Sequence, residues 1–128
     1  MKQRILVVDD EPQMRELLSM YLTQKGFQAS AAASSEEALR KVREKPVDCV
    51  VLDIGLGGED GLQLLVNLKT FDPNLRVIML TGMGFVEDLL QEAQLKGADG
   101  YVSKVLPLDE LIRALQKVLS QPKRAEAI

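Results

Sequence analysis

Four short apolar runs, each closed by polar residues, constrain the fold of this chain more than any other feature of its sequence. They are residues 5–8 before Asp9 and Asp10, residues 50–52 before Asp53, residues 77–80 before Thr81, and residues 101–103 before Lys104. Apolar runs of this length, separated by segments with helical spacing, indicate buried parallel strands. Because ligands of an open α/β sheet bind beyond the carboxyl ends of its strands, we expect these polar groups to meet at one edge.

The segments between the runs carry apolar residues at helical spacing. They predict five helices, beginning at about residues 12, 35, 62, 86 and 108, and a weaker strand over residues 27–33. Ser34 and Glu37 form a capping-box pattern, and Gly26 and Gly97 suit the ends of helices. Residues 54–61 hold four glycines and are expected to form a loop. The alternation predicts one domain over residues 1–120 with a parallel sheet, and a frayed tail or the start of a linker at 121–128.

Composition excludes several classes of function. The chain has 128 residues, a net charge of -3 and no histidine, which removes Ser-His-Asp and Cys-His catalysis and any phospho-accepting histidine. An acidic balance argues against a nucleic-acid surface. Cys49 is expected to be a small buried hydrophobe, and no apolar run is long enough to span a membrane. Without a signal peptide, a cytoplasmic location is expected.

The acidic residues at the predicted edge suggest metal and phosphoryl chemistry. Three carboxylates brought together repel one another, and a hard cation with oxygen ligands, Mg²⁺ above all, would offset their charge. Capping of the following helix is the alternative for Asp9 and Asp10. Asp53 is not needed as a cap and could act as a nucleophile toward an activated phosphoryl group. Thr81 and Lys104 would contact the phosphoryl oxygens, although each alone is more often an ordinary strand-end or surface residue.

The motifs in this order resemble the receiver domain of a bacterial two-component response regulator. The likeness covers nearly the whole chain, through Ile5–Glu11 (ILVVDDE), Asp53, Thr81-Gly82, the GADGY run at 97–101 and Ser103-Lys104. The resemblance implies a flavodoxin-like, doubly wound α/β fold with five parallel strands in the order 2-1-3-4-5 and five helices. It also implies a phosphoacceptor in a phosphorelay, receiving phosphate from a sensor histidine kinase, a phosphotransfer protein or a small acyl phosphate.

The resemblance also assigns roles to individual residues. Asp53 would accept the phosphoryl group, Thr81 and Lys104 would contact it, and Tyr101 would be the switch aromatic that turns inward when Thr81 moves. The Mg²⁺ ligands would be Asp9, Asp10, Asp53 and the backbone carbonyl of Gly55. The fourth helix, fifth strand and fifth helix would form the output face toward an effector domain or protein. The domain would modify only itself, and a monomer is expected, with dimerisation on phosphorylation as an alternative.

Two positions depart from the family pattern. Val105 follows Lys104 where the family usually has a cis proline, which predicts either a trans bond with a rearranged loop or a strained cis bond. Gly57 stands where the family tends to have proline, so the loop after Asp53 is expected to be looser than usual. Met83 and Gly84 likewise predict a mobile loop after Thr81.

Two other functions compete with the phosphorylated receiver. One is a protein-binding module of the same fold that signals without phosphorylation, motivated by the departures at Val105 and Gly57. The other is a Mg²⁺ phosphohydrolase resembling the haloacid dehalogenase family, in which a second Asp lies two positions after the nucleophilic Asp. Glu11 and Gly55 occupy those positions here, and the glycines of 55–61 match no nucleotide-binding spacing.

Overall fold

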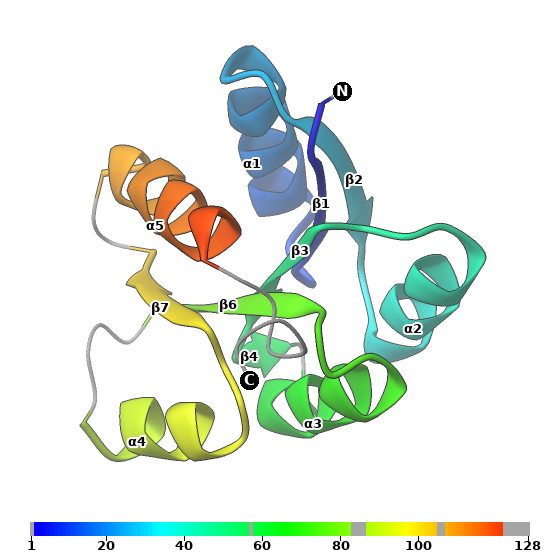
Figure 1. Cartoon of the computed structure of the whole chain (residues 1–128), viewed down its shortest axis with the longest axis vertical. Coiled ribbons are helices and arrows are strands. Elements are labelled where there is room, and N and C mark those ends of the chain that lie inside the picture. Colours follow the sequence, from blue (N-terminus) through cyan, green and yellow to red (C-terminus); the bar gives the residue numbers. More distant parts are fainter. Residues whose placement is uncertain (1, 57, 83–86, 105–106, 122–128) are drawn as a thin grey trace.

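The computed structural model describes residues 2–56, 58–82, 87–104 and 107–121. Strands and helices alternate along most of the chain, and a short extra strand pair precedes the third helix (Figure 1). The elements are β1 (Arg4–Val8), α1 (Pro12–Gln24), β2 (Gln28–Ala32), α2 (Ser35–Glu44), β3 (Cys49–Asp53), β4 (Gly55–Leu56), β5 (Glu59–Asp60), α3 (Gly61–Phe71), β6 (Arg76–Thr81), α4 (Glu87–Leu95), β7 (Gly100–Ser103) and α5 (Asp109–Ser120).

The main sheet has five parallel strands in the order β2-β1-β3-β6-β7. This confirms the predicted order 2-1-3-4-5, since β6 and β7 are the fourth and fifth strands of this sheet. β1 and β3 lie side by side near its centre, with Val8 opposite Leu52. Every strand therefore points its carboxyl end toward the same edge, which is where the predicted polar groups follow.

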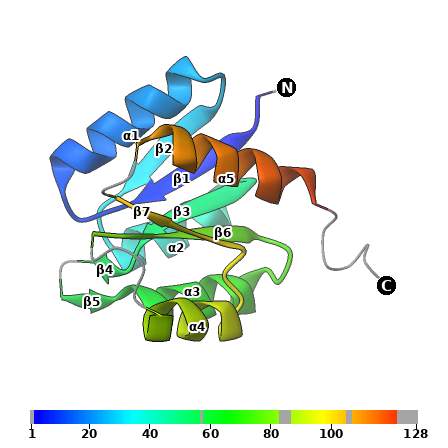
Figure 2. The ribbon, with the colours of Figure 1, turned by 90° about the vertical axis from the view of Figure 1, so that its left-hand side faces the viewer.

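The strands separate two apolar layers because their side chains alternate between the faces. On one face Leu6, Val8, Val50 and Leu52 pack under α2, α3 and α4. On the other face Ile5, Val7, Val51 and Ile78 pack under α1 and α5. Figure 2 shows α1 and α5 on one side of the sheet and α3 and α4 on the other. Burial on both faces explains why these strands are continuous apolar runs.

The predicted helix ends are confirmed where the structure describes them. Ser34 accepts a hydrogen bond from the backbone N–H of Glu37 at 3.2 Å, while the Glu37 carboxylate accepts one from the N–H of Ala33 at 2.7 Å. Gly26 has a φ of +95° and Gly97 a φ of +102°, the left-handed region that favours glycine after a helix. Cys49 is fully buried, as predicted.

The segment after Asp53 is more ordered than the predicted open loop. β4 and β5 form a two-residue antiparallel pair, with Gly55 opposite Asp60 and Leu56 opposite Glu59. The expectation of a plain loop was wrong because Leu56, only 1% exposed, anchors the segment in the core. The two ends of the segment are held together, since the N–H of Gly61 donates a hydrogen bond to the carbonyl of Ile54 at 3.2 Å.

Several predictions fall on residues that the structure does not describe. These are the isomer of the Lys104–Val105 bond, the effect of Gly57, the loop at Met83 and Gly84, and the tail at 122–128. The domain bounds of 1–120 also stay a prediction. Among the residues described, none of the helices combines the length and apolar character that crossing a bilayer requires.

Candidate functional site

Three carboxylates gather at the carboxyl edge of the two central strands. Asp9 follows β1 and is fully buried, Asp53 ends β3 and is 5% exposed, and Asp10 is exposed. Each contributes an oxygen to a group in which all oxygens lie within 4.8 Å of one another. The register of Val8 with Leu52 explains this, because it places the residues that follow both strands side by side.

Lys104 supplies the positive charge of the cluster. Its Nζ lies 2.7 Å from Oδ2 of Asp9, 2.9 Å from Oδ2 of Asp53 and 3.6 Å from Oε1 of Glu11. Burial acts to lower the pKa of Lys104, but hydrogen bonds and charge attraction from Asp9 and Asp53 outweigh it and hold that pKa above its ordinary value. The lysine is therefore a fixed cation between the two buried acids.

Backbone groups orient the same two carboxylates. Oδ1 of Asp9 accepts a hydrogen bond from the N–H of Glu11 at 2.9 Å, and Oδ1 of Asp53 accepts one from the N–H of Gly55 at 3.0 Å. In each acid, one oxygen is thus held by the following turn and the other faces Lys104. The turns therefore fix the orientation of both carboxylates toward the lysine.

The last two strands bring Thr81 and Lys104 to the same edge. Thr81 ends β6, is 2% exposed and lies opposite Ser103 in the register of β6 with β7. The N–H of Lys104 donates to the carbonyl of Thr81 at 2.8 Å. The two residues that sequence analysis assigned to the phosphoryl oxygens are therefore joined through their backbones.

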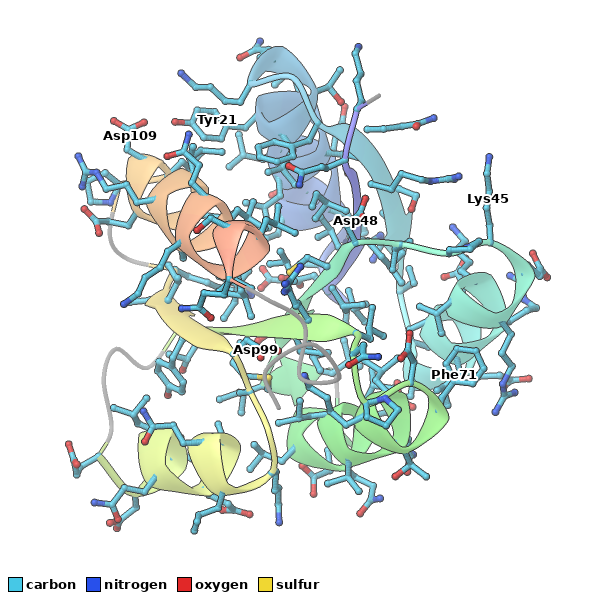
Figure 3. The ribbon with its side chains drawn as sticks, in the orientation of Figure 1. Tyr21, Lys45, Asp48, Phe71, Asp99 and Asp109 are labelled. Atoms are coloured by element: carbon cyan, nitrogen blue, oxygen red, sulfur yellow. The ribbon has the colours of Figure 1, made fainter. Side chains whose placement is uncertain are left out.

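Tyr101 lies on β7, two residues before the pair of Thr81 and Ser103. It is partly buried and packs against the apolar layer under α2, α3 and α4. Asp99 anchors the start of the strand: its carboxylate contacts Nζ of Lys69 at 2.7 Å and accepts a hydrogen bond from the N–H of Val77 at 2.9 Å (Figure 3). The switch role of Tyr101 stays a prediction.

Sequence analysis assigned no role to three residues that help build this site. Glu11 adds a further carboxylate near Lys104, and Arg15 donates to the backbone carbonyl of Asp9 at 2.8 Å. Gly61 is required by packing, because a Cβ there would lie 2.6 Å from the carbonyl oxygen of Asp53. Glu11 could have been found from its place in the acidic run. The close approach at Gly61 had no signal beyond one glycine among several.

The donor set of the cluster fits a hard divalent cation. Asp9, Asp10 and Asp53 offer carboxylate oxygens only, which Mg²⁺ and Ca²⁺ prefer over softer metals. Lys104 already compensates part of the negative charge of the three acids, and a bound divalent cation would compensate more of it and hold the acids closer together. With the ammonium and such a cation beside it, the carboxylate of Asp53 would be suited to attack an electrophilic phosphorus.

Comparison with known proteins gives concordant results for sequence and structure. The family model described as the response regulator receiver domain matches residues 5–116. Sporulation initiation phosphotransferase F of Bacillus subtilis is 36% identical over 119 residues, covering 93% of this chain and 95% of the relative. A putative response regulator NtrX-like of Rickettsia felis is 36% identical over 121 residues, but the match spans only 25% of that relative.

The solved structures agree with these relatives. A response regulator receiver domain protein (CheY-like) from Methanospirillum hungatei has a TM-score of 0.86 and 26% identity, covering 93% of this chain and 94% of that one. NtrX from Brucella abortus has a TM-score of 0.85 and 35% identity, covering 93% of this chain and 27% of NtrX. The similarity therefore spans whole single-domain proteins as well as one part of longer ones.

Proposed function

Since this chain belongs to the response regulator receiver domain family of two-component systems, we propose that Asp53 is its phosphoacceptor. The observation that carries the proposal is the ion pair of Asp53 with Lys104, 2.9 Å long, beside the buried Asp9. Asp53 is the acid at the end of a central strand that both the turn at Gly55 and the cation hold in place. A similar response regulator from Burkholderia pseudomallei, with a TM-score of 0.83 and 27% identity over 98% of this chain and 72% of that one, carries a phosphorylated aspartic acid and a calcium ion.

Receiver domains generally bind Mg²⁺, and the acidic cluster here has the oxygen donors that such an ion needs. We assign the ligands to Asp9, Asp10, Asp53 and the backbone carbonyl of Gly55. The ion would neutralise the charge that develops on the phosphoryl oxygens during transfer. Ca²⁺ prefers the same kind of oxygen donors.

The reaction forms one bond and breaks another. A carboxylate oxygen of Asp53 attacks phosphorus, while the bond from phosphorus to the donor's nitrogen or acyl oxygen breaks and its electrons leave with the donor. Lys104, which now contacts Asp9 and Asp53, would place its ammonium on a transferred phosphoryl oxygen, and the Thr81 hydroxyl would donate to another. Water would later attack the phosphorus of phosphorylated Asp53, the bond from phosphorus to the Asp53 oxygen would break, and inorganic phosphate would leave as the carboxylate is restored.

The signal would pass from the phosphoryl group to the α4–β7–α5 face. Movement of Thr81 toward the phosphate would shift the end of β7, because the carbonyl of Thr81 accepts a hydrogen bond from the N–H of Lys104. Tyr101 would then change its packing against the layer beneath α4. Phosphorylation would act on a two-state equilibrium by favouring one packing, rather than by creating a new fold.

Receiver domains interact with histidine kinases or phosphotransfer proteins, and we place this chain among those that receive phosphate from such a partner. It would catalyse only its own phosphorylation and dephosphorylation, without acting on a separate substrate. We expect a cytoplasmic monomer before phosphorylation, with an effector domain or protein as the recipient of the signal.

Intact-mass analysis after incubation with acetyl phosphate tests the phosphoacceptor. We expect wild type to gain one phosphoryl group when Mg²⁺ is present and none in EDTA, and Asp53→Asn to gain none. Asp60→Asn is the matched control: Asp60 caps α3 by accepting the N–H of Leu62 at 2.9 Å, and asparagine is an equally good cap. Equal labelling of wild type and Asp53→Asn would assign the phosphate to another residue.

The outcome also separates the competing functions. Absence of labelling in wild type under every condition, together with partner binding that Asp53→Asn leaves unchanged, would support the module that signals by contact alone. Rapid multiple turnover of a generic phosphate ester would instead support a phosphohydrolase. The family match and the intact set of acids, hydroxyl and ammonium favour the receiver over both.

A further inference from the structure

The outward side of α3 carries no charge. Its exposed residues are Gln63, Asn67, Thr70 and Phe71, and the one charged residue of the helix, Lys69, turns to Asp99 with its side chain 11% exposed. The neighbouring α2 shows the usual pattern, with several exposed charges along its outer side. Solvated helices normally carry charges outward, whereas the centres of protein interfaces are depleted of charge and enriched in aromatic residues.

Phe71 stands between two hollows where α2 and α3 meet. It ends α3 and is 48% exposed, and Figure 3 shows it beside α2. One hollow, of about 220 Å³, is lined mainly by Val42, Pro46, Val47 and Leu75. The other, of about 320 Å³, is lined by Leu39, Arg43, Asn67 and Thr70 together with Phe71. Both exceed the roughly 150 Å³ of an apolar cavity that accepts benzene, so each has room for an aromatic ring.

Arg43 borders both hollows and is exposed. Its neighbour Arg40 pairs with Glu37 and Glu44, but Arg43 has no ion pair with any described residue. An arginine beside a space for an aromatic ring is placed for a cation–π contact. Asp72, which directly follows Phe71, borders the same smaller hollow and could reach a cation on an opposing surface.

We propose that this surface, the α2–α3 face formed by Leu39, Arg43, Asn67, Thr70 and Phe71, pairs with the same face of a second copy of the chain. A two-fold interface uses one patch on both molecules, and this patch is self-complementary in charge, because it carries Arg43, which has no ion pair with any described residue, and is followed by Asp72. Phe71 of each copy, which forms one wall of the larger hollow, would lie against the hollow of the other copy beside its Arg43, and Asp72 would approach the same arginine. The uncharged side of α3 would meet itself without like-charge repulsion.

This association goes beyond the proposed phosphoryl transfer, because the α2–α3 face contains no residue of the acidic site. The interface is small, so a weak dimer is expected, with the chain monomeric at low concentration and associating as its concentration approaches about 1 mM. We also expect Asp53→Asn to associate as wild type does, without any phosphoryl donor.

Sedimentation velocity over a concentration series from about 10 µM to about 1 mM tests the pairing. The test variant is Phe71→Lys and the matched control is Leu95→Lys. Both positions are exposed apolar residues that end a helix, where a cation suits the helix dipole, so both variants are expected to fold. Phe71→Lys would place a cation opposite Arg43 and weaken association at least about tenfold, a loss of about 1.4 kcal/mol, whereas Leu95→Lys would sediment like wild type.

The outcomes are distinct. A wild type that stays monomeric up to about 1 mM would overturn the proposal, as would unchanged association of Phe71→Lys. Loss of association in Leu95→Lys alone would move the interface to α4 and equally overturn it. A nitroxide on Gln63→Cys, which is exposed on α3 one turn before the face, mixed with isotope-labelled wild type, supplies a second readout, since the buried Cys49 leaves one reactive position. Broadening of α2 and α3 resonances supports the pairing, and broadening confined to other surfaces contradicts it.

Discussion

Replacing Lys104 by methionine is expected to destabilise the fold strongly, although it changes no apolar core residue. Methionine keeps most of the length of the side chain and removes only the ammonium group. That group lies 2.7 Å from Asp9 and 2.9 Å from Asp53, and the three side chains are 11%, 0% and 7% exposed. The change therefore leaves two buried carboxylates without their cation, while the backbone hydrogen bonds to both acids remain.

The magnitude follows from these distances. At an effective dielectric constant of about 20, each contact has a gross attraction of about 6 kcal/mol. The cost of burying the ions offsets most of this, and removal of one member of a buried pair typically costs about 3–5 kcal/mol. For a slope of about 2 kcal/mol per M in urea, the unfolding midpoint should fall by about 2 M. Such a loss is a large share of the stability of an ordinary domain, about 5–15 kcal/mol.

Urea unfolding in EDTA and in Mg²⁺ provides the assay. We expect the loss to be largest in EDTA, since a bound divalent cation would offset the same carboxylates. In wild type the raised pKa of Lys104 means that its stabilisation is complete below its unfolded value, near 10.5, and is lost as the pH rises through the higher folded value.

Lys96→Met is the matched control for Lys104→Met. Lys96, the residue after α4, pairs with Glu92 of that helix at 3.6 Å, with side chains 36% and 49% exposed. Exposed pairs of this kind contribute about 0.3–0.5 kcal/mol. If Lys104→Met lost no more than this control in EDTA, the ammonium would not be the group that compensates the buried acids, and the electrostatic account of the site would be wrong.

Three further changes probe other parts of the structure. Gly61→Ala should cost about 1–3 kcal/mol in urea unfolding because its Cβ would lie 2.6 Å from the carbonyl oxygen of Asp53, whereas Gly82→Ala, whose nearest contact is 4.0 Å away, should cost less. Burial raises the pKa of the Cys49 thiol, so a thiol reagent at pH 8 should label wild type only as fast as it unfolds; immediate labelling would contradict the burial. A backbone hydrogen bond at the start of α2 lowers the pKa of Glu37, so its stabilisation is present above the unfolded value and lost as the pH falls through the folded one, and Glu37→Gln should therefore destabilise more at pH 7 than at pH 3.

Sequence analysis predicted the sheet well because each strand has a signal of its own. Burial on both faces makes β1, β3 and β6 continuous apolar runs, and the polar residues after them mark where each run ends. The grouping of Asp9 and Asp53 followed from the common direction of parallel strands and is confirmed. The strand order itself needed the resemblance, because apolar periodicity does not say which strands are neighbours.

The parts that sequence analysis missed depend on contacts between distant residues. The hairpin of β4 and β5 is too short to show a repeating pattern, and Leu56 looked like one apolar residue in a glycine-rich loop. The proximity of Glu11 to Lys104 requires the carboxyl end of β1 and the end of β7 to meet in space. The roles of Thr81 and Tyr101 stay predictions, since they concern a phosphorylated state.

The position of Lys104, directly after β7, has a consequence for how the domain fluctuates. β1 and β3, which carry the acids, are paired on both sides, while β7 pairs with β6 alone within the described sheet. Edge strands open locally at a lower free energy than central strands. Amide hydrogen exchange should therefore be faster along β7 than along β3. The acids therefore belong to the slowest-exchanging part of the molecule and their cation to a faster one. Brief local opening of β7 would move Lys104 away and expose Asp53 to a phosphoryl donor, while Asp9 and Asp53 stay in position.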